Sequence, residues 1–122
     1  MRLFRKSRII NYQKKEIERL ERNLKKISEG NFDIDLEVSV GDDIVRSEKE
    51  KFERLNRYML TMTQTFNNLI SDTKNLSDQT KNGNLDYRMD VSKYKGAYSN
   101  IGRDINTSVL SISGVLDEAS TV

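Results

Sequence analysis

The side chains that could do chemistry in this chain are carboxylates and tyrosines, because the sequence contains neither Cys nor His. Their absence removes thiolate nucleophiles, cysteine metal sites and the commonest general base. The densest carboxylates are Asp33, Asp35 and Glu37, followed by Asp42 and Asp43. Oxygen ligands at alternate positions suggest a cation site. The calcium-loop pattern D-x-[DN]-x-[DN]-G is not met, however, since its third acidic position holds Glu and no Gly follows.

We therefore expect these carboxylates to be solvated, and we interpret the five tyrosines as packing residues. No phosphate-binding glycine loop is present either. The sequence predicts a protein that is not an enzyme, with no catalytic residue, cofactor, metal or small-molecule substrate.

The composition indicates helices that need a partner. Among 122 residues there is no Pro, which suits long uninterrupted helices. Hydrophobic residues make up 35% and charged residues 33%, with a mean hydropathy of −0.72. This is polar for a monomer with a generous core, but a net charge of +2 is too small to indicate disorder. No stretch approaches the ~20 apolar residues of a transmembrane helix.

Charge is distributed unevenly along the chain. Residues 1–26 hold ten Lys or Arg and three Glu, whereas the remainder is net acidic. Three interpretations stay open for this basic start: a solvated helix face, a segment just cytoplasmic of a membrane span beside anionic lipid headgroups, or a nucleic-acid contact. Nucleic-acid binding is the least favoured, because few aromatic residues interleave with the basic ones. We expect residues 1–9 to be a basic segment next to a membrane.

A repeat is visible in the sequence. Residues 30–39 align without gaps to residues 83–92, with five identities and three conservative replacements. Each copy starts with Gly-Asn, at Gly30 and Gly83, after a helical pattern that has Lys near its end. Glycine in this position is typical of the left-handed residue that ends a helix. The chain therefore looks like one unit used twice.

Heptad-like spacing predicts three helices: one ending before Gly30, one continuous from about Val45 to Asn82, and one from about Tyr98. The middle stretch contains no Gly and no Pro. The apolar residues expected to form the core of the bundle are Ile17, Leu20, Leu24, Ile27, Phe52, Leu55, Met59, Met62, Phe66, Leu69, Leu76, Ile101, Ile105 and Ile112.

After each glycine the pattern changes to alternation, with apolar residues at even positions from Phe32 to Val40 in the first copy. Alternation is typical of a β-strand, but a strand here has only its own distant copy to pair with. We favour an extended connector that packs alternate side chains against helices, with a true strand as the alternative. The expected anchors are Phe32, Leu36, Val38, Leu85, Met89 and Val91.

A helix–connector–helix unit has one apolar stripe on each helix and no third element to cover it. One copy cannot bury its stripes, whereas two copies side by side make a four-helix bundle. The connector returns the chain along the bundle, so both helices of a unit run in the same direction. We predict an all-α fold of tandem units that form parallel four-helix bundles as a homodimer.

The repeated unit resembles the HAMP domain, the signalling linker of bacterial chemoreceptors, sensor kinases and cyclases. The resemblance is carried by the following segments: Gly30-Asn31-Phe32, Asp42-Asp43-Ile44, Gly83-Asn84-Leu85 and Ile101-x3-Ile105-Asn106. Two departures are present. Leu55-Asn56 lies about four residues later than the family spacing, and Tyr94-Lys95-Gly96-Ala97-Tyr98 replaces the acidic pair in the second unit.

The resemblance implies a first unit at residues 10–64, a divergent second unit at 65–122, and a helix at about 45–82 shared between them. It implies relay of a conformational change from an upstream sensor or transmembrane segment to a downstream signalling domain, on the cytoplasmic side of the bacterial inner membrane. A methyl-accepting chemotaxis protein is the expected kind of receptor. The implied relay residues are Gly30, Phe32, Leu36, Val38, Asp43, Ile44, Gly83, Leu85, Met89 and Val91. A coiled-coil scaffold that does not switch, or a basic arm that binds anionic membrane or nucleic acid, remains the alternative.

Overall fold

The computed structural model describes residues 2–121, and the side chains of this range except those of residues 113 and 115–121. Three α-helices account for most of the range: α1 (Arg2–Ser28), α2 (Arg46–Lys81) and α3 (Gly96–Thr121). A short 3-10 turn, η1 (Asp43–Val45), precedes α2. The described range contains no strand, so the prediction of an all-α fold is confirmed.

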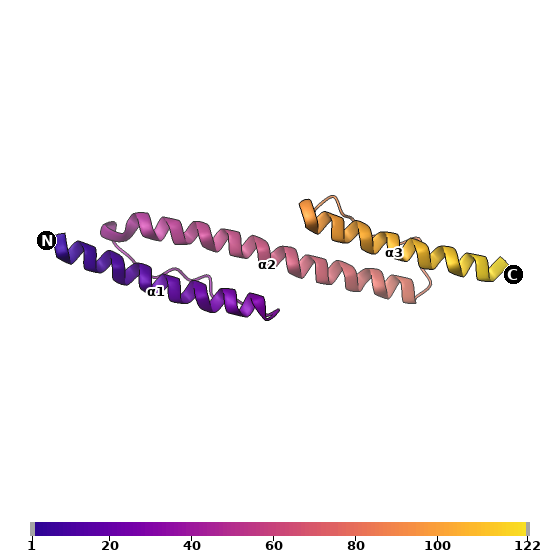
Figure 1. Cartoon of the computed structure of the whole chain (residues 1–122), viewed down its shortest axis with the longest axis horizontal. Coiled ribbons are helices and arrows are strands. Elements are labelled where there is room, and N and C mark those ends of the chain that lie inside the picture. Colours follow the sequence, from indigo (N-terminus) through magenta and orange to yellow (C-terminus); the bar gives the residue numbers. More distant parts are fainter. Residues whose placement is uncertain (1, 122) are drawn as a thin grey trace. The chain divides into compact units, whose positions relative to one another are not determined.

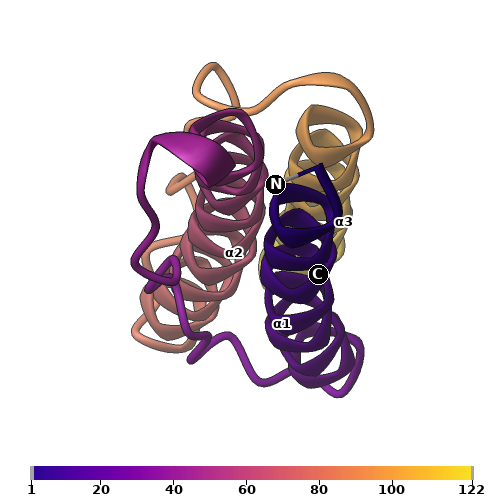
Figure 2. The ribbon, with the colours of Figure 1, turned by 90° about the vertical axis from the view of Figure 1, so that its left-hand side faces the viewer.

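The chain forms two compact units, Met1–Gln64 and Thr65–Val122, and their boundary falls inside α2. In the first unit, α1 and the first half of α2 lie side by side and run in the same direction, with the connector returning between their ends (Figure 1 and Figure 2). In the second unit, the rest of α2 and α3 also run in the same direction (Figure 1).

Both helices that precede a connector end in the same way. Gly30 and Gly83 have φ angles of +80° and +89°, a left-handed conformation that residues with a Cβ rarely adopt. The Gly30 N–H donates to Ile27 O at 3.0 Å, and the next N–H donates to Lys26 O at 2.9 Å. The same pair of bonds closes α2 around Gly83. This double closure is the Schellman motif, and it confirms both glycines as helix stops.

The segment between α1 and η1 is an extended connector without strand pairing, as the favoured interpretation predicts. Phe32, Leu36 and Val38 are half-buried, whereas Asp33 and Asp35 are exposed. Alternate side chains therefore pack against the helices while the carboxylates face solvent. The second connector likewise contains no strand and places Met89 in a buried position.

The middle helix is continuous from Arg46 to Lys81, close to the predicted range. Its start differs from the prediction in one respect, because η1 occupies Asp43–Val45 as a separate turn. The Asp42 carboxylate caps this turn by accepting the Ile44 N–H at 3.1 Å. The third helix begins at Gly96, two residues before the predicted Tyr98. None of the described helices is both long and apolar enough to cross a membrane.

Each unit has a small apolar core of its own. In the first unit it consists of Tyr12, Val45 and Phe52, with Ile9, Val38, Ile44 and Leu55 packed against it. In the second unit it consists of Leu76, Met89, Tyr94 and Val109, with Leu69, Tyr87, Val91, Tyr98 and Ile105 around it. These cores fix the connectors to the helices, because Val38 and Met89 take part in them.

Candidate functional site

Helix α1 buries polar side chains and leaves apolar ones exposed. The residues of α1 that are buried within the chain are Tyr12, Glu16, Arg19 and Asn23. Ile17 and Leu24 are instead 53% and 49% exposed. The polar side of the helix is therefore turned into the unit, and much of its apolar side lies open.

Apart from Phe4, the large exposed apolar residues of α1 follow a seven-residue spacing. Leu3, Ile10, Ile17 and Leu24 are all exposed, and we call these four residues the outer stripe. Repeats of seven are typical of helices that pack against other helices in coiled coils. Isolated exposed apolar residues need no explanation, but a stripe along 22 residues of one helix indicates a packing surface.

The predicted core residues fall into three groups by exposure. Phe52, Met59 and Leu76 are buried within the chain. Seven are half-buried: Leu20, Ile27, Leu55, Met62, Phe66, Leu69 and Ile105. Four are exposed: Ile17, Leu24, Ile101 and Ile112. The last two continue an apolar series on α3 with Ile105, so each unit leaves part of its predicted core uncovered within one chain.

The expected connector residues lie mostly against the helices. Met89 is buried, and Phe32, Leu36, Val38, Ile44, Leu85 and Val91 are half-buried. Asp43 is exposed and pairs with the neighbouring Arg46 on the surface. Asp42 pairs instead with Arg8 of α1 at 2.7 Å, and its pKa is lowered mainly by the hydrogen bond from that guanidinium.

Four polar side chains with little or no exposure meet between α1, the connector and α2 in the first unit. They are Glu16, Arg19, Asn23 and Asn56, and we call them the polar latch. Arg19 Nε donates to Glu16 Oε2 at 2.7 Å, and its Nη1 donates to Asn56 Oδ1 at 2.8 Å. Glu16 is 0% exposed, so this ion pair is removed from solvent.

The polar latch holds the connector by its backbone. Asn23 accepts the Asp35 N–H and donates to the Asp35 carbonyl, at 2.9 and 2.7 Å. Arg19 donates to the same carbonyl, Asn56 donates to the Leu36 carbonyl, and Glu16 accepts the Ser39 N–H. Every buried polar side-chain atom in the described residues has a hydrogen-bond partner, so the cluster is fully satisfied.

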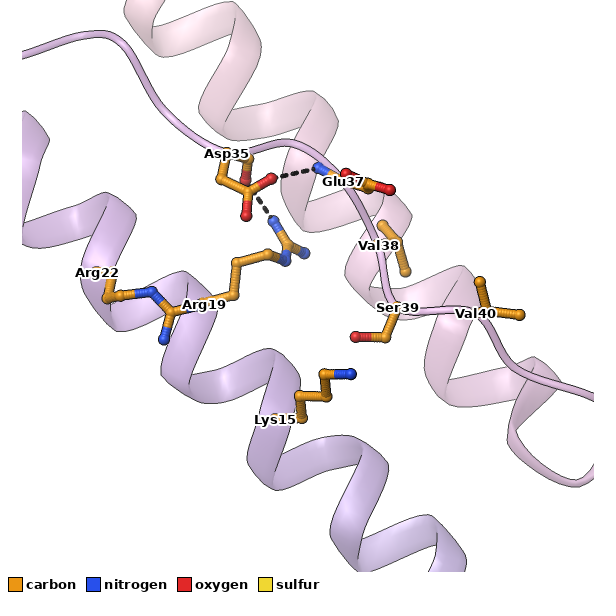
Figure 3. A pocket seen from close by; sticks show the side chains of 8 residues that line it. All are labelled: Lys15, Arg19, Arg22, Asp35, Glu37, Val38, Ser39 and Val40. Atoms are coloured by element: carbon orange, nitrogen blue, oxygen red, sulfur yellow. Dashed lines mark hydrogen bonds between the residues drawn. The ribbon is translucent and has the colours of Figure 1, made fainter.

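A shallow hollow lies beside the latch, between α1 and the connector, with a volume of about 290 Å³. Figure 3 shows Arg19 bonded to the Asp35 carbonyl, with Lys15 extending toward Ser39 and Val40. Three cationic side chains, Lys15, Arg19 and Arg22, and two carboxylates of the connector, Asp35 and Glu37, line the hollow. Arg19 already donates to three acceptors within the unit, so its guanidinium is used to hold the connector. Nowhere in the described residues do three or more metal-ligating side chains come together.

The second unit repeats one element of this arrangement. Asn106 accepts the Met89 N–H at 2.8 Å and donates to the Met89 carbonyl at 3.0 Å. Met89 occupies the same position in its connector as Leu36, which Asn56 holds in the first unit. An Asn from the second helix of each unit therefore fixes the same point of each connector. This geometry supports the sequence repeat as a repeat of structure.

The second unit replaces the rest of the latch by apolar packing. The residues 53 positions after Glu16, Arg19 and Asn23 are Leu69, Asp72 and Leu76. Leu76 is buried, and Asp72 lies at the edge, where Lys93 Nζ approaches it at 2.7 Å and Tyr94 Oη donates to it. Burial, and then the Asp72 carboxylate, raise the pKa of Tyr94. Burial opposes ionisation of Asp72, but the bonds from Lys93 and Tyr94 leave its pKa lowered.

The sequence reasoning missed the buried Glu16, Arg19 and Asn23. A signal was present, because Tyr12, Glu16, Arg19 and Asn23 have the 4-3-4 spacing of a helix face. This spacing was overlooked because the apolar series beside it has the same period, and because Glu and Arg are normally exposed.

Comparison with family models, with curated proteins and with solved structures gives no match.

Proposed function

We propose that two copies of the chain associate in parallel and relay a conformational change, as the resemblance to HAMP linkers implies. The observation that supports this proposal is the outer stripe of α1. Its four residues are exposed although the opposite, polar face is buried, so a single chain leaves the better packing surface unused. A second copy that presents the same stripe would cover it and complete a four-helix bundle.

The second unit has a matching surface. Thr73, Leu76, Thr80, Ile105 and Ile112 line a largely apolar hollow of about 250 Å³ between α2 and α3. Its helices run in the same direction, as in the first unit (Figure 1). In the proposed dimer this hollow faces the same hollow of the second copy. Each unit of one chain therefore pairs with the same unit of the other chain.

Relay requires two packings that differ little in free energy. The heptad seam of the helices includes Met59, Met62, Thr73, Thr80 and Ser108, which are softer or more polar than Leu or Ile. Input at α1 would change the populations of the two packings, α2 belongs to both units, and output would leave through α3. By the resemblance, the input is a sensor or transmembrane segment and the output a chemoreceptor-type signalling domain at the bacterial inner membrane.

A distance measurement between the two copies tests the relay. We expect a spin label at Ser111, an exposed position on α3, to give two distances whose proportions change with temperature. A label at Thr61, at an exposed position on α2, reports the first unit in the same way. One narrow distance at both positions under all conditions would identify a scaffold that does not switch.

A second candidate role concerns the start of α1. Leu3 and Phe4 are exposed there, and the first acidic residue of the chain is Glu16. Exposed apolar groups among cations favour an anionic bilayer surface. Sedimentation with vesicles of anionic or neutral lipid tests this role. Binding to anionic vesicles alone, lost at high salt, would support it, and equal binding to neutral vesicles would contradict it.

A further inference from the structure

The polar latch has a property that its separate contacts do not explain. Arg19 is 5% exposed and bonds to one acceptor on α1, one on the connector and one on α2. We propose that Glu16, Arg19, Asn23 and Asn56 act as one cooperative device that fixes α1 at a single rotational position and releases the connector all at once. This inference concerns contacts within the first unit and does not depend on the relay.

The cooperativity follows from burial of the charges. Glu16 is fully buried, and its carboxylate has two partners, Arg19 and the Ser39 N–H. If Arg19 leaves, an uncompensated carboxylate remains in a site without solvent, which is strongly unfavourable. If Glu16 leaves, the guanidinium loses its counter-ion in the same way. Each member of the polar latch therefore holds the others in place. Breaking the bonds of one member costs more free energy than separating all members together, because separation returns both charges to water.

The latch also makes the rotational position of α1 discrete. A rotation of α1 carries Glu16, Arg19 and Asn23 away from the connector together, because all three lie on one face of the helix. Apolar contacts would weaken gradually during such a rotation. The directed bonds to Asp35 and Ser39 break within a small angle instead, since hydrogen bonds weaken steeply as they bend.

The second unit provides the internal comparison. Its connector is bound by Asn106 at Met89, and Leu69 and Leu76 replace the charged and amide side chains of α1. Among the described side chains of this unit, the ion pair between helix and connector is that of Asp72 and Lys93, and both residues are partly exposed. We therefore expect cooperative release in the first unit and independent, local opening in the second.

Hydrogen exchange of single amides, measured by NMR on the full chain, tests the proposal. The Asp35 and Ser39 amides bond to Asn23 and Glu16, whereas the exposed Val40 has no bonded partner in the described part of the chain. The first two should be protected and Val40 should exchange freely. In the variant Glu16→Ala, we expect both protected amides to exchange about tenfold faster or more, although only Ser39 bonds to Glu16 directly.

Two further variants complete the test. Asn106→Ala should speed exchange at Met89 alone, since the described side chains of the second unit contain no counterpart of the buried Glu16–Arg19 pair. Glu16→Leu combined with Arg19→Met removes both charges and keeps the volume, so it secures a folded first unit if Glu16→Ala does not fold. This double variant should retain the helices and lose protection at Asp35.

Protection at Asp35 that stays within about twofold of the original, while Ser39 exchanges faster, would overturn the proposal, because the bonds would then be independent. Loss of protection throughout α1 in the double variant would overturn it as well. That result would mean that the cluster holds the two helices together and does not act on the connector.

Discussion

Replacing two residues of the outer stripe should weaken self-association without unfolding the chain. Ile17 and Leu24 are about half exposed, at 53% and 49%, so about half of each side chain remains to be buried in a dimer. Full burial of such a side chain contributes ~1.5–3 kcal/mol, and the remaining half therefore ~1 kcal/mol. Two side chains in each of two copies give ~4 kcal/mol. At about 1.4 kcal/mol per tenfold, the variant Ile17→Gln with Leu24→Gln should raise the dimer Kd ~1000-fold.

Sedimentation equilibrium over a range of protein concentrations measures this Kd, and circular dichroism measures the helix content of the same samples. Gln has nearly the helix propensity of Leu, so the helix content of the fully associated protein should not fall. The control is Leu110→Gln, because Leu110 is 61% exposed but lies outside the series of Ile101, Ile105 and Ile112. Its Kd should change by less than about threefold. A Kd for the double variant within about tenfold of the original would refute the assignment of the stripe to the interface.

Three further predictions concern the second unit. A Cβ at Gly102 would lie 2.7 Å from Val91 Cγ1, so Gly102→Ala should lower the thermal midpoint by overpacking, at a cost of ~1–3 kcal/mol. A Cβ at Gly114 would meet open space, so Gly114→Ala should add up to ~1 kcal/mol of stability and raise the thermal midpoint. Equal shifts of the midpoint for the two variants in calorimetry would contradict the close packing at Gly102. The pKa of Asp72 is lowered, so its contribution to stability is present above its unfolded pKa and is lost as pH falls through the folded one. In the variant Asp72→Asn, the free energy of unfolding should therefore fall less steeply as the pH is lowered through the folded pKa of Asp72. An unchanged dependence of unfolding on pH would argue against the contact of Asp72 with Lys93 and Tyr94. Thr73→Leu should fill the apolar hollow, add ~1 kcal/mol of stability by burial and so raise the melting temperature of the dimer. A lower melting temperature would place Thr73 outside the interface.

The helices and connectors were predictable because their signals are local. A seven-residue apolar period and the glycines at 30 and 83 define helix ends without knowledge of the tertiary fold. The preference for a connector over a strand is confirmed in the described residues, since a strand needs a neighbour and the other copy lies 53 residues away in the sequence. The short turn η1 was missed because three residues carry no period, and its cap at Asp42 was interpreted as part of an acidic pair.

The polar latch was not predictable from apolar periodicity. In α1 the residues that are buried within the chain include Glu16 and Arg19, whereas Ile17 is largely exposed. In the proposed dimer each helix would have two packed faces, one toward its own unit and one toward the second copy. Sequence reasoning finds the apolar face and assigns it to the nearest core. The spacing of Glu16, Arg19 and Asn23 marks a second face of the helix but does not show that it is buried, because the burial of a charge depends on partners that are distant in sequence, such as Asn56.

The central claim is that the chain forms a parallel dimer in which each unit packs against its own copy. Oxidative crosslinking tests it directly, because the chain has no native Cys. Single cysteines at Leu20, Leu69 and Ile105 should each form disulfide-linked dimers. Cysteines at Glu18 and Thr107, which are exposed and lie on other faces of α1 and α3, should not. Failure of all three positions to crosslink, or equal crosslinking at the two control positions, would contradict the account.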